Sequence, residues 1–262
     1  MARTLSFFSI VLLCLGCTYY MHSLPFDFEE EGAVLELGKE LAEISGMFYK
    51  DDQSIYAIQD EKGKIYEINT HTGKFKPILS FKSKGDFEGL TYVYPHYYVL
   101  KSDGDIYKVS EDGEFEKFTF PDNKGFEFEG IALHPDKNAL IVACKKHGDK
   151  DEKDFIWLYS FSLEKEHYMQ DPFLKYSKDD VHDKFQASGI SFDEEGKLYL
   201  ISAKSFTIAA FDSSLQLIDK AQLPYLRYPQ VEGICFAPDG TLYLSSEKGD
   251  QNKGKLIILR KE

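Results

Sequence analysis

The sequence predicts an all-β fold, a five-bladed β-propeller of four-stranded antiparallel blades, on three observations. A short motif, in which an acidic residue or serine precedes a glycine and an apolar residue, recurs five times. The steps between its glycines are 43, 41, 59 and 44 residues, and short strands repeating about every 40 residues are typical of propeller blades. No stretch has a helical period. The five glycines are Gly46, Gly89, Gly130, Gly189 and Gly233.

The second repeat illustrates how each blade is expected to be built. Asp103-Gly104 and Asp112-Gly113 separate runs rich in β-branched and aromatic residues, and Asp-Gly between such runs is a strong hairpin signal. The predicted strands are residues 89–93, 97–100, 106–109 and 115–120. The longer 59-residue step is attributed to two charged, solvated loops at 147–154 and 178–184, and not to a sixth blade.

The last repeat is one strand short of a complete blade. The chain ends soon after residues 256–259, and the strand predicted at 33–37 has no other partner. A ring closed by that N-terminal strand would leave no long unpaired edge. We therefore expect residues 33–37 to complete the fifth blade and the fifth blade to lie beside the first.

The first residues have the pattern of an export signal. Arg3 precedes an apolar run at 5–15, which is too short to span a bilayer as a helix, and Gly16-Cys17 follows. A cysteine at this place resembles the lipobox of bacterial lipoproteins, which implies that Cys17 carries a lipid. The alternative is an ordinary signal peptide cut nearby. We expect a signal at 1–17, a tether at 18–32 and the propeller domain at 33–262.

Composition supports a globular domain and limits its partners. The 262 residues are 43% hydrophobic and 15% aromatic, so the chain can bury a large core. Its formal net charge of -13 argues against nucleic acid or an anionic membrane surface as a partner. Cys144 and Cys235 lie in apolar strands and are expected to be buried free thiols. We expect a monomer.

The strand pairing predicts an acidic cluster at one end of the central channel, which we call the funnel. If the first two strands of each blade pair about the predicted turns, the residue before each glycine faces a residue about fifteen positions later. Four carboxylates would then converge, and Glu129 would face Lys145. The predicted pairs are Ser45 with Asp60, Glu88 with Ser102, Glu129 with Lys145, Ser188 with Ala203, and Glu232 with Glu247.

Such a cluster is typical of a cation site, although a structural role is equally compatible with it. Carboxylates held together raise one another's pKa unless a cation or hydrogen-bond donors compensate. Ca²⁺ is bound by oxygen ligands and is abundant outside cells, so we expect Asp60, Glu88, Glu232 and Glu247 to be its ligands, with Glu129 a weaker candidate. The alternative is that these side chains accept backbone N–H groups. No His/Cys spacing typical of zinc is present.

In its motifs the chain resembles the SdiA-regulated family of bacterial five-bladed propellers, which are NHL-like. The likeness covers about residues 33–260 and includes the export signal, the repeated Glu-Gly or Ser-Gly strand starts, Asp60-Glu61 and the segment 245–247. It implies a propeller attached to a membrane and facing the periplasm or the exterior, with a calcium site and no established activity. Ser45 and Ser188 depart from the Glu-Gly form.

Two classes of function are consistent with these features. The first is a non-catalytic lipoprotein that binds calcium and a small-molecule or protein ligand. The second is a metal-dependent hydrolase of phosphate esters or lactones. Against the hydrolase, only Lys101, Lys145 and Lys204 lie near the predicted funnel, and no Gly-x-Ser-x-Gly motif is present. The sequence therefore favours binding.

Overall fold

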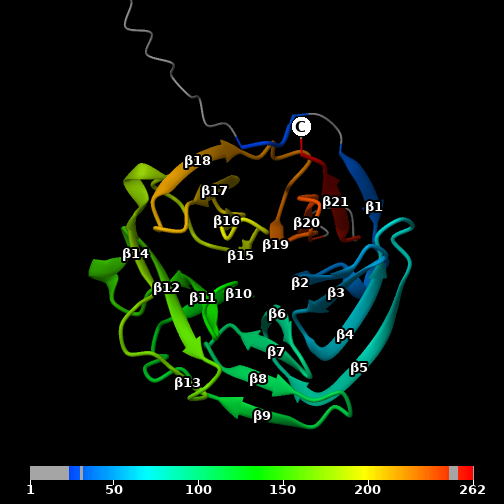
Figure 1. Cartoon of the computed structure of the whole chain (residues 1–262), viewed down its shortest axis with the longest axis horizontal. Helices are drawn as coiled ribbons and strands as arrows, with labels where there is room; N and C mark the ends of the chain where they lie inside the picture. Colours follow the sequence, from blue (N-terminus) through cyan, green and yellow to red (C-terminus); the bar gives the residue numbers. More distant parts are fainter. Residues whose placement is uncertain (1–23, 30–31, 248–252, 262) are drawn as a thin grey trace, which may run out of the picture.

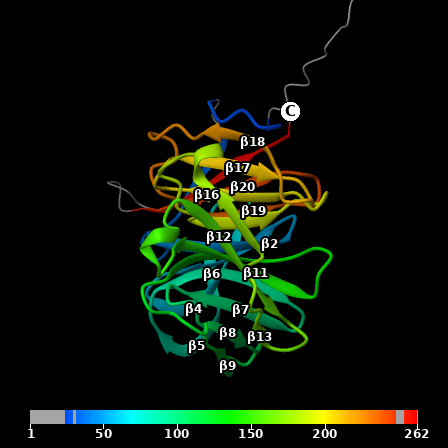
Figure 2. The ribbon, with the colours of Figure 1, turned by 90° about the vertical axis from the view of Figure 1, so that its left-hand side faces the viewer.

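Five antiparallel sheets surround a central axis in the computed structural model, which describes residues 24–29, 32–247 and 253–261. Their innermost strands lie nearest the axis (Figure 1), and the strands cross the ring from one face to the other (Figure 2). The predicted five-bladed propeller is therefore confirmed. The only helices among the described residues are the short 3-10 turns η1 (Lys39–Leu41), η2 (Lys150–Glu152) and η3 (Lys178–Asp180).

Blades 1 to 4 follow the chain outward from the axis, and blade 5 does so until the N-terminal strand completes it. Blade 1 contains β2 (Ile44–Asp51), β3 (Ser54–Gln59), β4 (Lys62–Asn69) and β5 (Phe75–Lys84), and blade 2 contains β6 (Phe87–Val93), β7 (His96–Lys101), β8 (Ile106–Val109) and β9 (Phe115–Phe118). Blade 3 contains β10 (Glu127–Leu133), β11 (Ala139–Lys146), β12 (Phe155–Ser162), β13 (His167–Tyr168) and β14 (Leu174–Ser177). Blade 4 contains β15 (Gly189–Phe192), β16 (Leu198–Ser202), β17 (Thr207–Phe211) and β18 (Leu217–Gln222), and blade 5 contains β19 (Val231–Phe236), β20 (Leu242–Ser246), β21 (Lys255–Leu259) and β1 (Ala33–Glu36).

The predicted hairpin turns occur where Asp-Gly pairs punctuate blade 2. Gly104 and Gly113 have φ values of +84° and +86°, which an L side chain rarely adopts, so glycine suits both turns. The strands on either side of these turns pair in register, with Leu100 opposite Ile106 and Val109 opposite Phe115. Turn chemistry thus fixes where the strands of this blade begin and end.

Blade 3 accommodates the longer repeat without a sixth sheet in the described part of the chain. The strands β13 and β14 pair with successive parts of β12, Phe161 facing Tyr168 and Leu158 facing Leu174. Together they take the place of a single fourth strand. The two charged segments predicted as loops contain the turns η2 and η3. The extra residues are therefore used in loops and in a divided outer strand.

The ring closes through the N-terminal strand, as predicted. The strand β1 is antiparallel to β21, with Ala33 opposite Ile258 and Glu36 opposite Lys255. Blade 5 therefore combines the beginning and the end of the described chain, and its inner strand β19 contacts β2 of blade 1.

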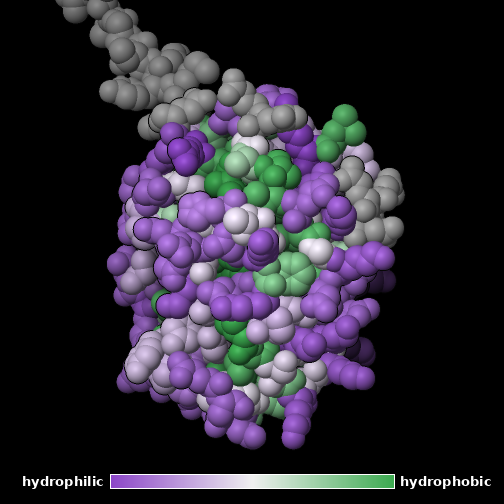
Figure 3. Space-filling view, turned by 90° about the vertical axis from the view of Figure 1, so that its right-hand side faces the viewer, coloured by the Kyte–Doolittle hydropathy of each residue, from purple (hydrophilic) through white to green (hydrophobic). Residues whose placement is uncertain are grey.

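The flank that carries β1, β4 and β5 is mainly hydrophilic, with apolar residues in separate patches (Figure 3).

Residues 24–29 lie within the segment predicted as a tether and pack on blades 4 and 5. Leu24, Phe26 and Phe28 are buried in the same apolar cluster as residues of β16, β19 and β21. The Leu24 N–H donates a hydrogen bond to the Asp219 carboxylate on β18 at 2.8 Å, and this segment runs beside β18 in Figure 1. The predicted signal at 1–17, including Cys17, lies outside the described residues.

The buried core is divided into clusters between neighbouring blades. Cys144 and Cys235 are buried free thiols, as predicted. Burial raises the pKa of the Cys144 thiol to about 12 and that of Cys235 further still, so both stay protonated at neutral pH.

No helix among the described residues is long and apolar enough to cross a membrane.

Candidate functional site

The five repeated glycines form a narrow neck where the inner strands meet at the axis. A Cβ atom on Gly46 would lie 2.5 Å from the Gly89 Cα of the next blade, and one on Gly130 would lie 3.2 Å from the Gly189 Cα. A Cβ on Gly189 would lie 2.5 Å from the Glu232 carbonyl oxygen of blade 5. The cavity at this neck measures only about 10 Å³. The motif therefore contains glycine because five backbones converge here.

In blades 1, 2 and 5 the residue before the glycine lies in a β-bulge, and the predicted register is wrong on both sides of it. In blade 2, Phe87 faces Lys101 and Gly89 faces Leu100, which leaves Glu88 as the extra residue. Blades 1 and 5 have the same irregularity at Ser45 and Glu232. A bulge adds one residue to one strand of a pair, and counting from the turns cannot detect it.

The corrected pairs show which predicted contacts are present. The N–H groups of Asp60, Ser102 and Glu247 donate hydrogen bonds to the carbonyl oxygens of Glu43, Asp86 and Gln230, respectively. These residues therefore do not lie opposite Ser45, Glu88 and Glu232, contrary to the prediction. Two predicted pairs do touch through side chains. The Ala203 N–H donates to the Ser188 Oγ at 3.1 Å, and Lys145 forms an ion pair with Glu129.

The bulged carboxylates interact with one another at one end of the neck. Burial, followed by repulsion from Glu129, raises the pKa of Glu88 to about 8, with Asp60 and Glu247 adding to the rise. Burial, followed by repulsion from Glu129 and Glu247, raises the pKa of Glu232 well above its usual value. The structure thus brings four of the predicted carboxylates into one electrostatic cluster, the acidic funnel: Glu88, Glu129, Glu232 and Glu247.

Lys145 supplies positive charge inside the acidic funnel. Its amino group pairs with the buried Glu129 carboxylate and is attracted to Glu232 and Glu88 as well. Burial alone would lower the pKa of Lys145, but these attractions outweigh it and the pKa is raised. For Glu129, burial outweighs the attraction of Lys145, and its pKa is raised too. Lys145 therefore offsets part of the negative charge of the cluster.

Asp60 lies at the edge of this cluster. Burial, followed by repulsion from Glu43 and Glu61, raises the pKa of its carboxyl to about 6. Asp60 also raises the pKa of Glu88, so the two carboxyls sense each other. The Oδ1 atom of Asp60 is buried and has no hydrogen-bond partner among the described residues. The strongest electrostatic neighbours of Asp60 thus belong to the surrounding loops.

The fit to a metal ion is partial. Among the described residues, no three His, Cys, Asp or Glu side chains are arranged so that they could hold one metal ion. The half-buried Glu88 and Glu232 carboxyls repel each other when both are ionised, and a hard cation stabilises such a pair. These two carboxyls are therefore the candidate ligands for a cation at this end of the neck.

The other end of the neck opens into a cavity with an aromatic rim that the sequence reasoning missed. We call this cavity the mouth; it measures about 340 Å³ and all five innermost strands line it. The signal was present in the repeats, because the third residue after each glycine is aromatic or leucine. These residues are Tyr49, Tyr92, Leu133, Phe192 and Phe236.

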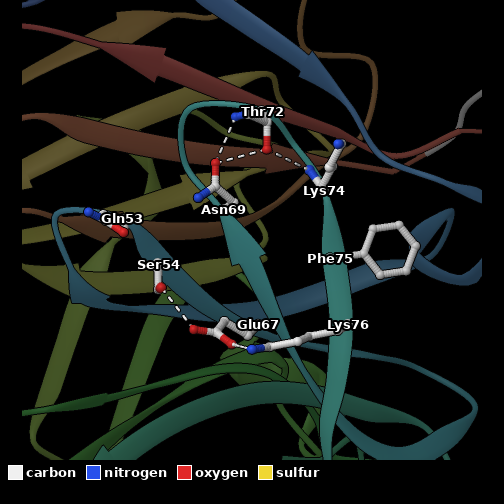
Figure 4. Close-up of a pocket in the computed structure, with 8 residues that line it drawn as sticks. All are labelled: Gln53, Ser54, Glu67, Asn69, Thr72, Lys74, Phe75 and Lys76. Atoms are coloured by element: carbon white, nitrogen blue, oxygen red, sulfur yellow. Dashed lines mark hydrogen bonds and ion pairs between the residues drawn. The ribbon is translucent and has the colours of Figure 1, made fainter.

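Two further cavities lie away from the axis. One of about 380 Å³ lies on the outer strands of blade 1, where Ser54 and Lys76 bond to the Glu67 carboxylate at 3.0 and 2.7 Å and Thr72 bonds to Asn69 (Figure 4). Its polar groups thus stabilise the blade itself. The other, of about 580 Å³, lies in the seam between blades 5 and 1.

The fold, the funnel and the mouth define a five-bladed propeller with an acidic cluster at one end of its axis and an aromatic rim at the other. The model of the SdiA-regulated family matches residues 31–249, and the chain belongs to this family. A search of curated proteins gives no match.

Solved structures share the fold at low sequence identity. The PQQ-bound aldose sugar dehydrogenase of Streptomyces coelicolor has a TM-score of 0.59 at 12% identity, covering 88% of this chain and 98% of that chain. The luciferin-regenerating enzyme has a TM-score of 0.56 at 14% identity, covering 87% and 95%. A chain of the nidogen–laminin complex has a TM-score of 0.53 at 15% identity, covering 78% and 72%. At such identities the likeness shows the fold alone.

Proposed function

We propose that this chain is an exported propeller of the bacterial cell envelope, attached to a membrane by a lipid on Cys17, which binds calcium and a ligand without transforming that ligand. The acidic funnel carries the proposal, because Glu88, Glu232 and their neighbours are held together inside the ring, where their ionised forms repel one another. Binding a cation would relieve that repulsion. Propeller folds serve both enzymes and binding proteins, so the proposal rests on the site and not on the fold.

Lys145 sets the expected strength of calcium binding. Its charge already offsets part of the acidic funnel and repels an incoming cation. We therefore expect weak binding, with a Kd of about 10⁻⁴–10⁻³ M, which is typical of extracellular calcium modules. Calcium outside the cell is concentrated enough to occupy such a site.

Calcium binding should release protons at neutral pH. The pKa of Glu88 is about 8, so its carboxyl is largely protonated at pH 7 without the ion, and the pKa of Glu232 is raised well above its usual value. A metal binds the deprotonated carboxylate, so binding must displace these protons. Calorimetric titration of the chelator-treated protein at pH 7 should give heats that vary with the ionisation enthalpy of the buffer. The double variant Glu88→Gln, Glu232→Gln should lose the binding.

A matched control separates the funnel from general surface charge. The double variant Glu111→Gln, Glu114→Gln removes the same formal charge from an exposed turn of blade 2 and should bind calcium as the wild type does. Equal heats from the funnel variant and the wild type would reject the calcium site. Calcium-dependent hydrolysis of p-nitrophenyl phosphate or a simple lactone, lost in the funnel variant, would contradict the non-catalytic part of the proposal.

The lipid anchor has its own expected result. Cys17→Ser should move the protein from the membrane fraction to the soluble fraction, because the lipid would have no attachment point. Cys14 lies three residues before Cys17, within the apolar run, and the variant Cys14→Ser should remain in the membrane fraction. Fractionation followed by mass spectrometry of the N-terminal peptide measures both. Membrane retention of Cys17→Ser would show that another segment holds the protein there.

A further inference from the structure

We propose that the mouth is a binding site for a small apolar organic cation, with a quaternary ammonium group as its typical ligand. This site lies at the opposite end of the neck from the acidic funnel. It depends on neither calcium nor the lipid, so it goes beyond the proposed function and can fail independently of it.

The repeat itself builds the mouth. Side chains two residues apart lie on the same face of a strand, so the first and third residues after each glycine share one face. The first position is aliphatic in every blade and forms a collar next to the neck, consisting of Met47, Leu90, Ile131, Ile190 and Ile234. The third position forms the outer ring of four aromatic residues and a leucine. The cavity therefore has aliphatic side chains at its base and aromatic side chains at its rim, and the polar residues Thr91 and Ser191 line it as well.

The aromatic rim is only half covered by other residues. Tyr92, Phe192 and Phe236 are half-buried, and Leu133 is 38% exposed. Phe48 extends the rim and stacks with Tyr92 at a centroid distance of 5.9 Å and an interplanar angle of 7°. Because these residues come from different blades and the sheets fix their backbones, the mouth is preformed. A preformed cavity that combines aromatic side chains with polar groups is a usual form of a small-molecule site.

Charge determines which apolar ligand the mouth favours. Among the described residues that line it, none is Lys, Arg or His, whereas Glu194 is acidic and exposed. Aromatic rings attract cations through their quadrupole, and a formal net charge of -13 attracts cations to the whole chain. An anion would meet neither a partner nor a favourable field. A quaternary ammonium group suits the site because its methyl groups are apolar and need no hydrogen-bond acceptor.

The neck separates this site from the acidic funnel. The cavity between them, of about 10 Å³, admits no more than a water molecule. An organic cation in the mouth would therefore not reach Glu88 or Glu232. This separation makes Glu88→Gln a control for cation binding at the wrong end of the channel.

Three probes of nearly equal shape and different charge test the inference. Choline, neutral 3,3-dimethylbutanol and anionic 3,3-dimethylbutyrate should be titrated by NMR into the protein in the presence of a calcium chelator. We expect choline to bind at least about tenfold more tightly than the neutral probe, because a desolvated cation–aromatic contact contributes enough for that factor. The anion should bind more weakly than either. Glu194→Gln should weaken choline binding about two- to fivefold, as expected for an exposed charge.

Substitutions that remove a ring but keep an apolar side chain locate the site. Phe192→Leu and Tyr92→Leu should each weaken choline binding about tenfold, since each removes a cation–aromatic contact, and should change the affinity for 3,3-dimethylbutanol much less. Tyr225→Leu makes the same kind of change on a different loop, where Tyr225 is 56% exposed, and should leave choline binding unaltered. Glu88→Gln should also leave it unaltered. Equal affinities for choline and the neutral probe, or a choline affinity unaffected by Phe192→Leu and Tyr92→Leu, would overturn the inference.

Discussion

Replacing Glu88 with glutamine should make the calcium-free protein more stable at pH 9 and leave its stability almost unchanged at pH 4. In the folded protein the pKa of Glu88 is about 8, chiefly because the carboxyl is buried and is repelled by Glu129. In the unfolded chain the carboxyl has its ordinary pKa near 4.5. Glutamine resembles the protonated form and does not titrate.

The direction of the effect follows from proton linkage. Below about pH 4 the carboxyl is protonated in both states, so it contributes no difference between them. Between its two pKa values the unfolded chain loses the proton while the folded protein keeps it, so the free energy of unfolding decreases as pH rises. Above pH 8 the folded protein carries the buried charge and the decrease levels off. The total is on the order of 3–5 kcal/mol, at about 1.4 kcal/mol for each pKa unit.

Denaturant unfolding from pH 4 to pH 9 with a calcium chelator measures this difference. Glu36→Gln is an informative control, because a hydrogen bond from Lys253 lowers the pKa of Glu36, the opposite shift. That variant should lose stability at neutral pH and lose none at low pH. If the free energies of unfolding of the wild type and Glu88→Gln changed in parallel with pH, Glu88 would ionise as readily in the folded protein as in the unfolded chain. The carboxyls of the acidic funnel would then not destabilise the fold. The Glu232 carboxyl should behave as Glu88 does, since the pKa of both is raised.

Sequence patterns were sufficient for the ring because local chemistry determines it. Asp-Gly turns mark the hairpins, the glycine steps mark the blades, and the orphan strand at residues 33–37 indicates the closure. Each of these signals can be recognised in the sequence alone, the turns from their residue types and the blades from their spacing. The structure has β1 beside β21 and five sheets, in agreement with those signals.

The site was harder to predict because it depends on departures from regular pairing. In blade 2 the register differs from the predicted one even between the turn and the bulge, where Gly89 faces Leu100, so an unbroken ladder would place Lys101 and not Ser102 opposite Glu88. The bulge at Glu88 then shifts the pairing by one more residue, and Ser102 bonds to Asp86. Position before the glycine was still sufficient to bring Glu88, Glu129 and Glu232 together, because all three follow the same local geometry. Asp60 lies at a different repeated position, directly after the second strand of its blade as Ser102 and Glu247 do, and its closer electrostatic neighbours are Glu43 and Glu61.

Adding a single methyl group at the neck should strongly destabilise the protein. In Gly46→Ala the new Cβ would lie 2.5 Å from the Gly89 Cα and 2.7 Å from the Leu90 nitrogen, which belong to the neighbouring blade. Both are backbone atoms in paired strands, so neither can rotate away as a side chain would. Blades 1 and 2 would have to separate at the axis. We expect a loss of about 2–3 kcal/mol, in the upper range for an overpacked core.

Thermal and denaturant unfolding of Gly46→Ala measure that loss, and a Tm decrease of about 4–12 °C would correspond to it for a domain of this size. Gly38→Ala adds the same methyl group at a residue with φ of -73°, where the nearest atoms belong to the Phe75 ring, 3.0 Å away. That ring can shift, so the control should lose much less stability. Equal Tm values for Gly46→Ala and Gly38→Ala would mean that the neck has room for a side chain. The convergence of five backbones would then not explain why glycine recurs in the motif.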